Sequence, residues 1–254
     1  MKKIVFNYFT LLLVLFYICN SCASNRIKQS ADAHYKLGLS YLETGDDAEA
    51  MKEFRKALNI GGPDPKIYYA ISTYYLQRGD VGNAKLYIER AINLDNDNSE
   101  YLNAYASVLA ANGEHEKAIK IWKKVLEDPT YAAREVVYYN LGFAYYQLGD
   151  YDKTIEYWKD SIRENPTVIR PYISLFRLYL EEGYDSKAVD LLKDGINRNP
   201  ISSTLKMYLA EYYYNRKQYS EASSLFYDII EVSPNSEEAR EAKNYLKRLG
   251  LYHE

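Results

Sequence analysis

The fold is decided by the stretch over residues 141–158, which reads LGFAYYQLGDYDKTIEYW. Leu141, Gly142 and Tyr145 are spaced i, i+1 and i+4, so they share one face of a helix. Gly149 follows, and glycine ends a helix in a left-handed conformation at little cost. After it, a small residue and a tryptophan four positions later share a face of a second helix. The stretch therefore predicts two helices joined by a tight turn.

The same pattern recurs with a period of 34 residues, and one block is two residues longer. The blocks begin at Ala31, Pro65, Ser99, Glu135, Ile169 and Ser203. The seventh position is large and apolar in every block: Leu37, Ile71, Tyr105, Leu141, Leu175 and Leu209. The eighth is mostly small: Gly38, Ser72, Ala106, Gly142, Phe176 and Ala210. The fifteenth is glycine in five blocks and lysine in the sixth: Gly45, Gly79, Gly113, Gly149, Gly183 and Lys217.

The second half of each block has a recurring face of its own. Its twentieth position is small: Ala50, Ala84, Ala118, Thr154, Ala188 and Ala222. Its twenty-fourth position is bulky: Phe54, Ile88, Trp122, Trp158, Leu192 and Phe226. A small residue opposite a large one lets two helix axes approach closely. Pro166, Pro200 and Pro234 fall between blocks, where they end a helix rather than break one. Six antiparallel helix pairs are therefore expected.

The period and these residues resemble the tetratricopeptide repeat over residues 31–236. The resemblance implies an all-α fold, a right-handed superhelical solenoid of six helix pairs closed by a capping helix. The predicted repeats cover residues 31–64, 65–98, 99–134, 135–168, 169–202 and 203–236. Residues 237–254 are the predicted cap, since a repeat array needs a polar-faced end for solubility. Two positions depart from the family pattern, Phe176 at the small eighth position and Lys217 at the turn glycine.

The N-terminus has the layout of an export signal, with Lys2 and Lys3, a short apolar run and then small residues. The run is shorter than the roughly 20 apolar residues that span a bilayer. A signal peptide is predicted over residues 1–21. Cys19 and Cys22, the two cysteines of the chain, lie at its end. They leave no internal disulfide framework for the exported domain.

The cysteine placement resembles the lipobox of bacterial lipoproteins. Cys22 follows the small Ser21, whereas the bulky Ile18 precedes Cys19. The family prefers leucine three residues before the lipidated cysteine, and here Cys19 stands there. The resemblance implies a lipid on Cys22, a tether over residues 22–30, and export to a bacterial membrane, at the periplasmic face of the outer membrane. The alternatives are lipidation of Cys19 and simple cleavage of a secreted protein.

Composition and motifs argue against catalysis and nucleic-acid binding. The net charge of −3 gives no electrostatic reason to expect nucleic acid, whose binding would need a clustered basic face. His34, His115 and His253 are scattered and lack metal-ligand spacing. The run over residues 95–100 begins like a calcium loop but lacks its glycine and final glutamate, so it is interpreted as an inter-repeat turn with capping residues. We expect no enzyme, metal, cofactor, nucleic acid or small-molecule substrate.

A protein-binding groove follows from the family resemblance. In tetratricopeptide repeats, positions 2, 5, 9, 12 and 13 of each first helix line the concave side. Carried onto this chain, the groove comprises Tyr35, Leu39, Leu42, Tyr69, Leu76, Tyr139, Phe143, Tyr146, Arg170, Ile173, Arg177 and Tyr214, and Leu180, Glu211 and Asn215 occupy further such positions. Exposed aromatic patches of this kind mark protein contacts. Alternatively, curvature of the array buries some of these residues against neighbouring repeats.

The insertion before the fourth repeat carries a second, narrower resemblance. It reads Asp128-Pro129-Thr130-Tyr131-Ala132-Ala133-Arg134. With six repeats and a lipobox, it is similar to the type IV pilus pilotin lipoproteins, which help an outer-membrane secretin assemble. That family usually has Asn-Asn-Tyr-Gly in its third repeat, where this chain has Asn103-Ala104-Tyr105-Ala106.

The sequence thus predicts a non-enzymatic, membrane-anchored scaffold that binds envelope proteins or their peptide segments. One alternative is a pilotin-like factor that assists secretin or pilus assembly. The other is a structural envelope protein that self-associates through the same aromatic patches.

Overall fold

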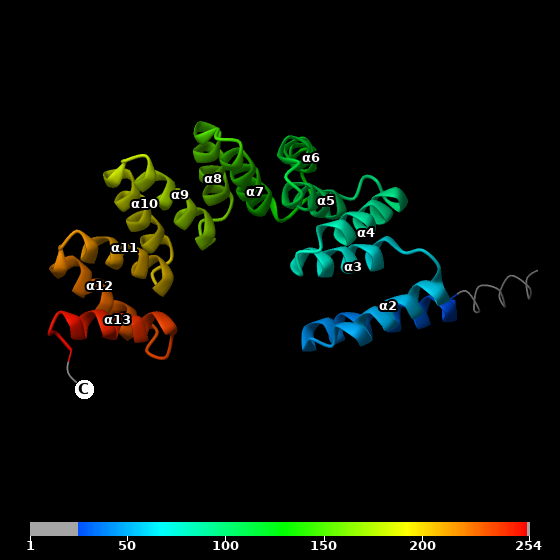
Figure 1. Cartoon of the computed structure of the whole chain (residues 1–254), viewed down its shortest axis with the longest axis horizontal. Coiled ribbons are helices and arrows are strands. Elements are labelled where there is room, and N and C mark those ends of the chain that lie inside the picture. The colour runs from blue at the N-terminus through cyan, green and yellow to red at the C-terminus, as the bar shows by residue number, and fades with distance from the viewer. Residues whose placement is uncertain (1–24, 253–254) are drawn as a thin grey trace, which may run out of the picture. The chain divides into compact units, whose positions relative to one another are not determined.

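The computed structural model describes residues 25–252, and every regular element in that range is a helix (Figure 1). The chain divides into two compact units, Met1–Asp128 and Pro129–Glu254. Unit 1 holds a helix over residues 25–44, then α2 (Asp47–Gly61), α3 (Pro65–Gln77), α4 (Val81–Leu94), α5 (Ser99–Ala111) and α6 (His115–Glu127). Unit 2 holds α7 (Arg134–Gln147), α8 (Tyr151–Glu164), α9 (Ile169–Glu181), α10 (Asp185–Arg198), α11 (Ser203–Asn215), α12 (Tyr219–Val232) and α13 (Glu237–Arg248).

The helix starts confirm the period that the sequence predicts. Four first helices begin at the first residue of a block, and α7 begins one residue earlier. Polar side chains cap several of these starts. Asn98 accepts hydrogen bonds from the backbone N–H groups of Glu100 and Tyr101, and Ser202 accepts one from Leu205. The acidic run over residues 95–100 is therefore the capping turn that its pattern indicates.

The turns within the helix pairs share one backbone conformation. The glycines at the turn position have φ between 75° and 83°. Lys217 adopts the same left-handed conformation with φ 61°, and no other non-glycine residue in the described range has a positive φ. The missing glycine therefore changes the energy of the sixth turn but not its geometry.

Close packing within each pair explains the small residues at the eighth position. A Cβ added to Gly142 would lie 2.6 Å from Nε1 of Trp158, and one added to Gly38 would lie 2.6 Å from Cε1 of Phe54. The twentieth and twenty-fourth positions are buried in all six repeats. In these two repeats a ring from the second helix thus rests directly on the backbone of the first.

In the fifth repeat the large and small residues exchange helices, with the large Phe176 on α9 and the small Gly195 on α10. Phe176 is buried, and its ring contacts Tyr208 and Tyr212 of α11 edge-on, at centroid distances of 6.2 and 6.1 Å. The close approach moves to Gly195 of α10, where an added Cβ would lie 2.8 Å from the ring of Tyr172. The departure at Phe176 is thereby compensated inside unit 2.

The structure differs from the sequence-based expectations at the beginning of the array. Leu37 is 43% exposed, although the seventh position is buried or half-buried in the other five repeats. The described chain offers no preceding repeat to cover it. Residues 25–30, expected to form part of a tether, are helical. The export signal, Cys19 and Cys22 lie outside the described residues.

The C-terminal helix α13 has the two faces that a cap requires. Ala239, Ala242 and Leu246 are fully buried against unit 2. Most of the charged residues of α13 are exposed, namely Glu237, Arg240, Glu241, Lys247 and Arg248. Among residues 25–252, no helix has both the length and the apolar character to cross a bilayer.

Candidate protein-binding surfaces

The aromatic residues of α7 do not form one exposed stripe. Tyr139 and Tyr146 stack on Trp158 at centroid distances of 6.1 and 6.0 Å and pack against the core of unit 2. Phe143 is 43% exposed. The reason is local, because positions 139 and 146 stand three before and four after Gly142 and therefore flank the ring that rests on it. All three residues were expected to point away from the interior, but only Phe143 does.

The hydroxyl groups of these tyrosines connect α7 to α9. Tyr139 Oη lies 3.2 Å from Oγ of Ser174, and Tyr146 donates a hydrogen bond of 3.4 Å to Oε2 of Glu181. The negative charge of Glu181, together with burial, raises the pKa of Tyr146. Both tyrosines therefore combine packing with positioning of the neighbouring first helix.

On α9, the predicted groove residues differ in their exposure and in their contacts with other side chains. Arg170 is exposed and forms no ion pair within the described part of the chain. Ile173 is half-buried against the core of unit 2. Arg177 donates a hydrogen bond of 2.7 Å to the Tyr208 hydroxyl, and its guanidinium lies 5.3 Å from the centre of that ring. Arg177 thus contacts α11 although it remains exposed.

A hollow of about 320 Å³ lies between α9 and α11. Its lining consists of Phe176, Leu180, Tyr208, Glu211, Tyr212, Asn215 and Arg216. Three of these, Leu180, Glu211 and Asn215, occupy groove positions predicted from the sequence. The sequence analysis did not predict that Phe176, Tyr208 and Tyr212 line a hollow. The departure of Phe176 from the small eighth position was the feature that could have indicated it. The last groove residue of unit 2, Tyr214, contacts the rings of Tyr219 and Tyr245 at 5.6 and 4.8 Å.

In unit 1 the predicted groove residues are all half-buried. Tyr35, Leu39 and Leu42 pack against the core formed by α2 and α3, and Leu76 packs against the core around α4. Tyr69 contacts the ring of Tyr101 at 5.4 Å and donates a hydrogen bond of 2.8 Å to Oε1 of Glu100. These residues join neighbouring repeats as well as lining the surface, as the alternative of burial by neighbouring repeats anticipates.

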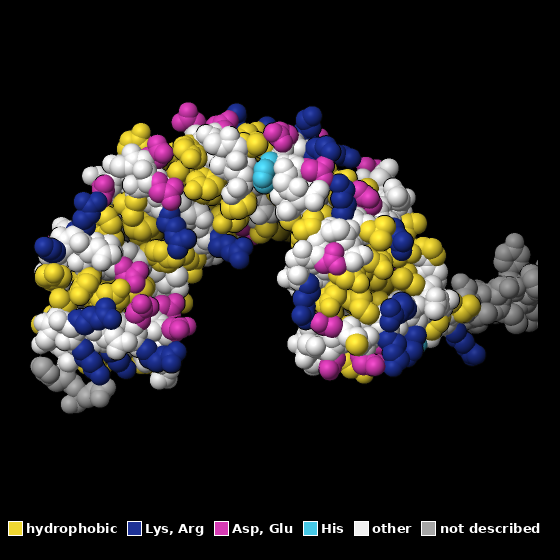
Figure 2. Space-filling model, in the orientation of Figure 1, with side chains coloured by type: hydrophobic (Ala, Val, Ile, Leu, Met, Phe, Trp, Pro, Cys, Tyr) yellow, Lys and Arg dark blue, Asp and Glu magenta, His cyan; other side chains and the backbone are white. Residues whose placement is uncertain are grey.

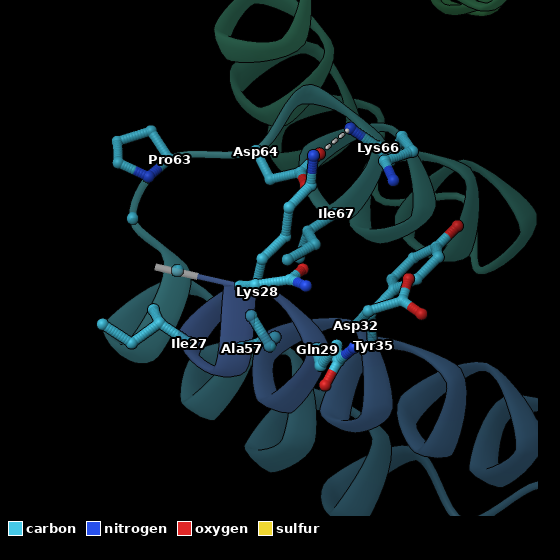
Figure 3. A pocket seen from close by; sticks show the side chains of 14 residues that line it. Ile27, Lys28, Gln29, Asp32, Tyr35, Ala57, Pro63, Asp64, Lys66 and Ile67 are labelled. Atoms are coloured by element: carbon cyan, nitrogen blue, oxygen red, sulfur yellow. Dashed lines mark hydrogen bonds between the residues drawn. The ribbon is translucent and has the colours of Figure 1, made fainter. Parts of the chain in front are cut away.

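Tyr35 also borders a hollow of about 560 Å³ at the beginning of the array (Figure 3). The hollow lies between the first helix and the connection from α2 to α3, and its charged lining residues are Lys28, Asp32, Asp64 and Lys66. Burial raises the pKa of Tyr35, and the nearby carboxylates Asp64 and Asp32 add to the effect. The mixed charges give this hollow no preference for one sign.

On the face that Figure 2 shows, basic and acidic side chains alternate around apolar ones, without a large patch of one sign. No cluster of three or more potential metal ligands occurs among residues 25–252. What these surfaces present is therefore apolar and aromatic contact area with scattered charges, which suits the binding of a protein segment.

Three stretches of the chain match the family model described as the tetratricopeptide repeat, at residues 31–61, 65–98 and 136–168. They coincide with the first, second and fourth helix pairs. The chain therefore contains tetratricopeptide repeats at these three stretches. Helical scaffolds built from such repeats bind peptides or proteins and are typically not catalytic.

Particular relatives belong to type IV pilus biogenesis. The type IV pilus assembly protein PilF of Pseudomonas aeruginosa is 28% identical over 159 residues, which are 61% of this chain and 62% of PilF. The alignment thus spans less than two thirds of that relative. A solved structure of Pseudomonas aeruginosa PilF matches 86% of this chain and 98% of its own, with 25% identity and a TM-score of 0.63. The type IV pilus biogenesis factor PilW shares the fold, with 18% identity, a TM-score of 0.67 and coverage of 84% and 98%.

Proposed function

We propose that this protein is a lipid-anchored scaffold of the bacterial envelope that binds a segment of a partner in type IV pilus assembly. The similarity to PilF over most of the chain supports the pilus context. The lipobox-like residues before and including Cys22 support the anchor, since a diacylated and N-acylated terminus holds a protein stably on a membrane.

One observation, the exposure of Phe143, supports a binding surface on unit 2. Its ring is 43% exposed in the middle of α7, while the neighbouring aromatic residues of that helix are packed. An exposed aromatic ring is the kind of anchor that dominates protein interfaces. Arg170, on the next first helix, is available to orient an acidic group of the partner.

A pilotin-like role is the more specific form of this proposal. The Asp-Pro-x-Tyr-x-x-Arg stretch ahead of α7 favours it, and Tyr131 of that stretch is 8% exposed. In this form the bound partner is a subunit of an outer-membrane secretin. Self-association through the same surface is the competing function, and light scattering of the purified protein distinguishes a monomer from an oligomer.

Site-specific photocrosslinking in the cells that make the protein tests the binding surface. A benzoylphenylalanine at position 143 is expected to yield a covalent adduct with a pilus-assembly or secretin protein. The same probe at position 86 is the matched control, because Leu86 is 45% exposed but lies on the second helix α4.

Equal adducts from the two positions, or none from position 143, would overturn the placement of the surface. A covalent dimer from position 143, with no other adduct, would favour the self-associating function. Position 143 suits this test better than the flanking tyrosines, since replacing Tyr139 or Tyr146 would also disturb the packing of Trp158.

A further inference from the structure

We propose that the hollow between α9 and α11 binds a guanidinium or ammonium side chain of the protein partner, held between aromatic walls and the carboxylate of Glu211. This proposal rests on the proposed function, in which unit 2 binds a protein segment. It specifies one chemical feature of that segment, a basic residue.

The walls of the hollow are aromatic and firmly held. Phe176 is 4% exposed and contacts the rings of Tyr208 and Tyr212 edge-on. Leu180 completes the apolar lining. A volume of about 320 Å³ accommodates one long side chain. Cations are attracted to aromatic faces, and the attraction strengthens where water is excluded.

Glu211 supplies the charge that a bound cation would balance. Its Oε1 accepts a hydrogen bond of 3.1 Å from the Tyr245 hydroxyl. Within the described residues, no lysine, arginine or histidine lies within ion-pair distance of this carboxylate. Burial raises the pKa of Glu211, and the charge of Glu241 adds to the effect. A half-buried carboxylate without a cation is costly, and a basic group from a partner would relieve that cost.

The two arginines near the hollow already have partners within the chain, and their guanidinium groups lie over the rings of the hollow's tyrosines. Arg177 is bound to Tyr208, and Arg216 pairs with Asp185 while its guanidinium lies 5.4 Å from the centre of the Tyr212 ring. Each tyrosine of the wall therefore already contacts one guanidinium from the chain itself. The hollow between them, beside Glu211, offers a similar environment to a guanidinium from a partner.

Two small probes test the inference without knowledge of the partner. Acetyl-arginine amide and acetyl-citrulline amide have nearly the same shape, but only the first is charged. Titration of the purified protein, followed by NMR of the tyrosine ring protons, is expected to show roughly tenfold tighter binding of the arginine probe. Equal binding of the two probes, or no binding of either, would overturn the proposal.

The variant Glu211→Gln keeps the shape of the side chain and removes its charge. It is expected to reduce binding of the arginine probe to the level of the citrulline probe. Glu181→Gln is the matched control, because Glu181 bonds a tyrosine hydroxyl in the same way but does not line the hollow. An equal loss in both variants would refute a role specific to Glu211.

The outcome is separable from that of the proposed function. If the crosslink from position 143 forms while the two probes bind equally, the cation site is refuted and the scaffold function stands. If the arginine probe binds in a charge-dependent way but no crosslink forms, the cation site is supported and the proposed location of partner binding falls.

Discussion

Lys217 shows at the scale of one residue how the repeat tolerates a departure from its pattern. It takes the left-handed turn conformation that glycine adopts in the other five repeats. A side chain makes this conformation costly, whereas glycine adopts it freely. The helix pair of α11 and α12 nevertheless forms, because its packing outweighs the strain in the turn.

Lys217→Gly is therefore expected to stabilise the protein by about 1 kcal/mol, after allowance for the greater freedom of glycine in the unfolded chain. Urea denaturation measures the change. The reverse substitution Gly183→Lys is the matched control and is expected to destabilise by a similar amount, since open space surrounds an added Cβ there. If neither variant changes the denaturation midpoint, the turn carries no strain.

The two cysteines allow a test of the proposed anchor. Cys22→Ala is expected to move the protein from the membrane fraction to the soluble fraction and to delay its processing, because the acylated side chain would be lost. Fractionation followed by immunoblotting measures this. Cys19→Ala is the control and should leave the protein on the membrane. The reverse pattern would assign the lipid to Cys19 instead.

At the scale of the helix pair, the packing of α7 on α8 requires that Gly142 has no side chain, because the Trp158 ring lies against it. Gly142→Ala would place a methyl group against Trp158 and is expected to destabilise the protein by about 1 to 3 kcal/mol. Gly82→Ala in α4 is the control, for which we expect a change in the free energy of unfolding of the opposite sign. The nearest atom to its added Cβ is Oδ1 of Asp80 at 3.7 Å, an ordinary van der Waals contact, so the gain in helix propensity should stabilise by about 0.5 to 1 kcal/mol. Thermal denaturation should therefore show a lower melting temperature for Gly142→Ala and a higher one for Gly82→Ala.

The capping helix α13 makes a comparable test at the end of the array. Deleting the chain from Glu237 onward would expose the buried Phe226, on whose ring Tyr245 stacks at 4.8 Å. The truncated protein is expected to lose stability and to aggregate, as light scattering would show. Glu241→Ala, on the exposed side of α13, should leave solubility unchanged. A truncated protein as soluble and stable as the full chain would contradict the capping role.

For the whole molecule, stability is expected to be distributed, since each repeat contacts only its neighbours. Trp158→Ala removes a ring that Tyr139 and Tyr146 cover, at a cost of about 3 to 5 kcal/mol. Amide hydrogen exchange should accelerate most in α7 and α8 and progressively less in α9 and beyond. Uniform acceleration across both units would instead indicate that the array unfolds as one cooperative block.

Much of this architecture could be predicted from the sequence because it is local and repeated. The positions of Gly149, Thr154 and Trp158 recur in every block of the repeat, and helix spacing alone places them in a turn and a core. The twentieth and twenty-fourth positions were accordingly assigned without error. The wrong assignments concern residues whose exposure depends on a second element, such as Leu37, which no described repeat covers.

The candidate site could be predicted only in part, for the same reason. Groove positions indicate which side of a first helix a residue occupies, but not whether a neighbouring ring covers it. Tyr139 and Tyr146 are packed because Trp158 rises above Gly142, while Phe143 stays free. The sequence by itself determined the helix pairs, their turns and their shared interior, since these follow from short-range periodicity. Only the tertiary structure decided which aromatic rings face solvent and that Phe176 and Glu211 border one hollow, because both depend on contacts between side chains of different helices.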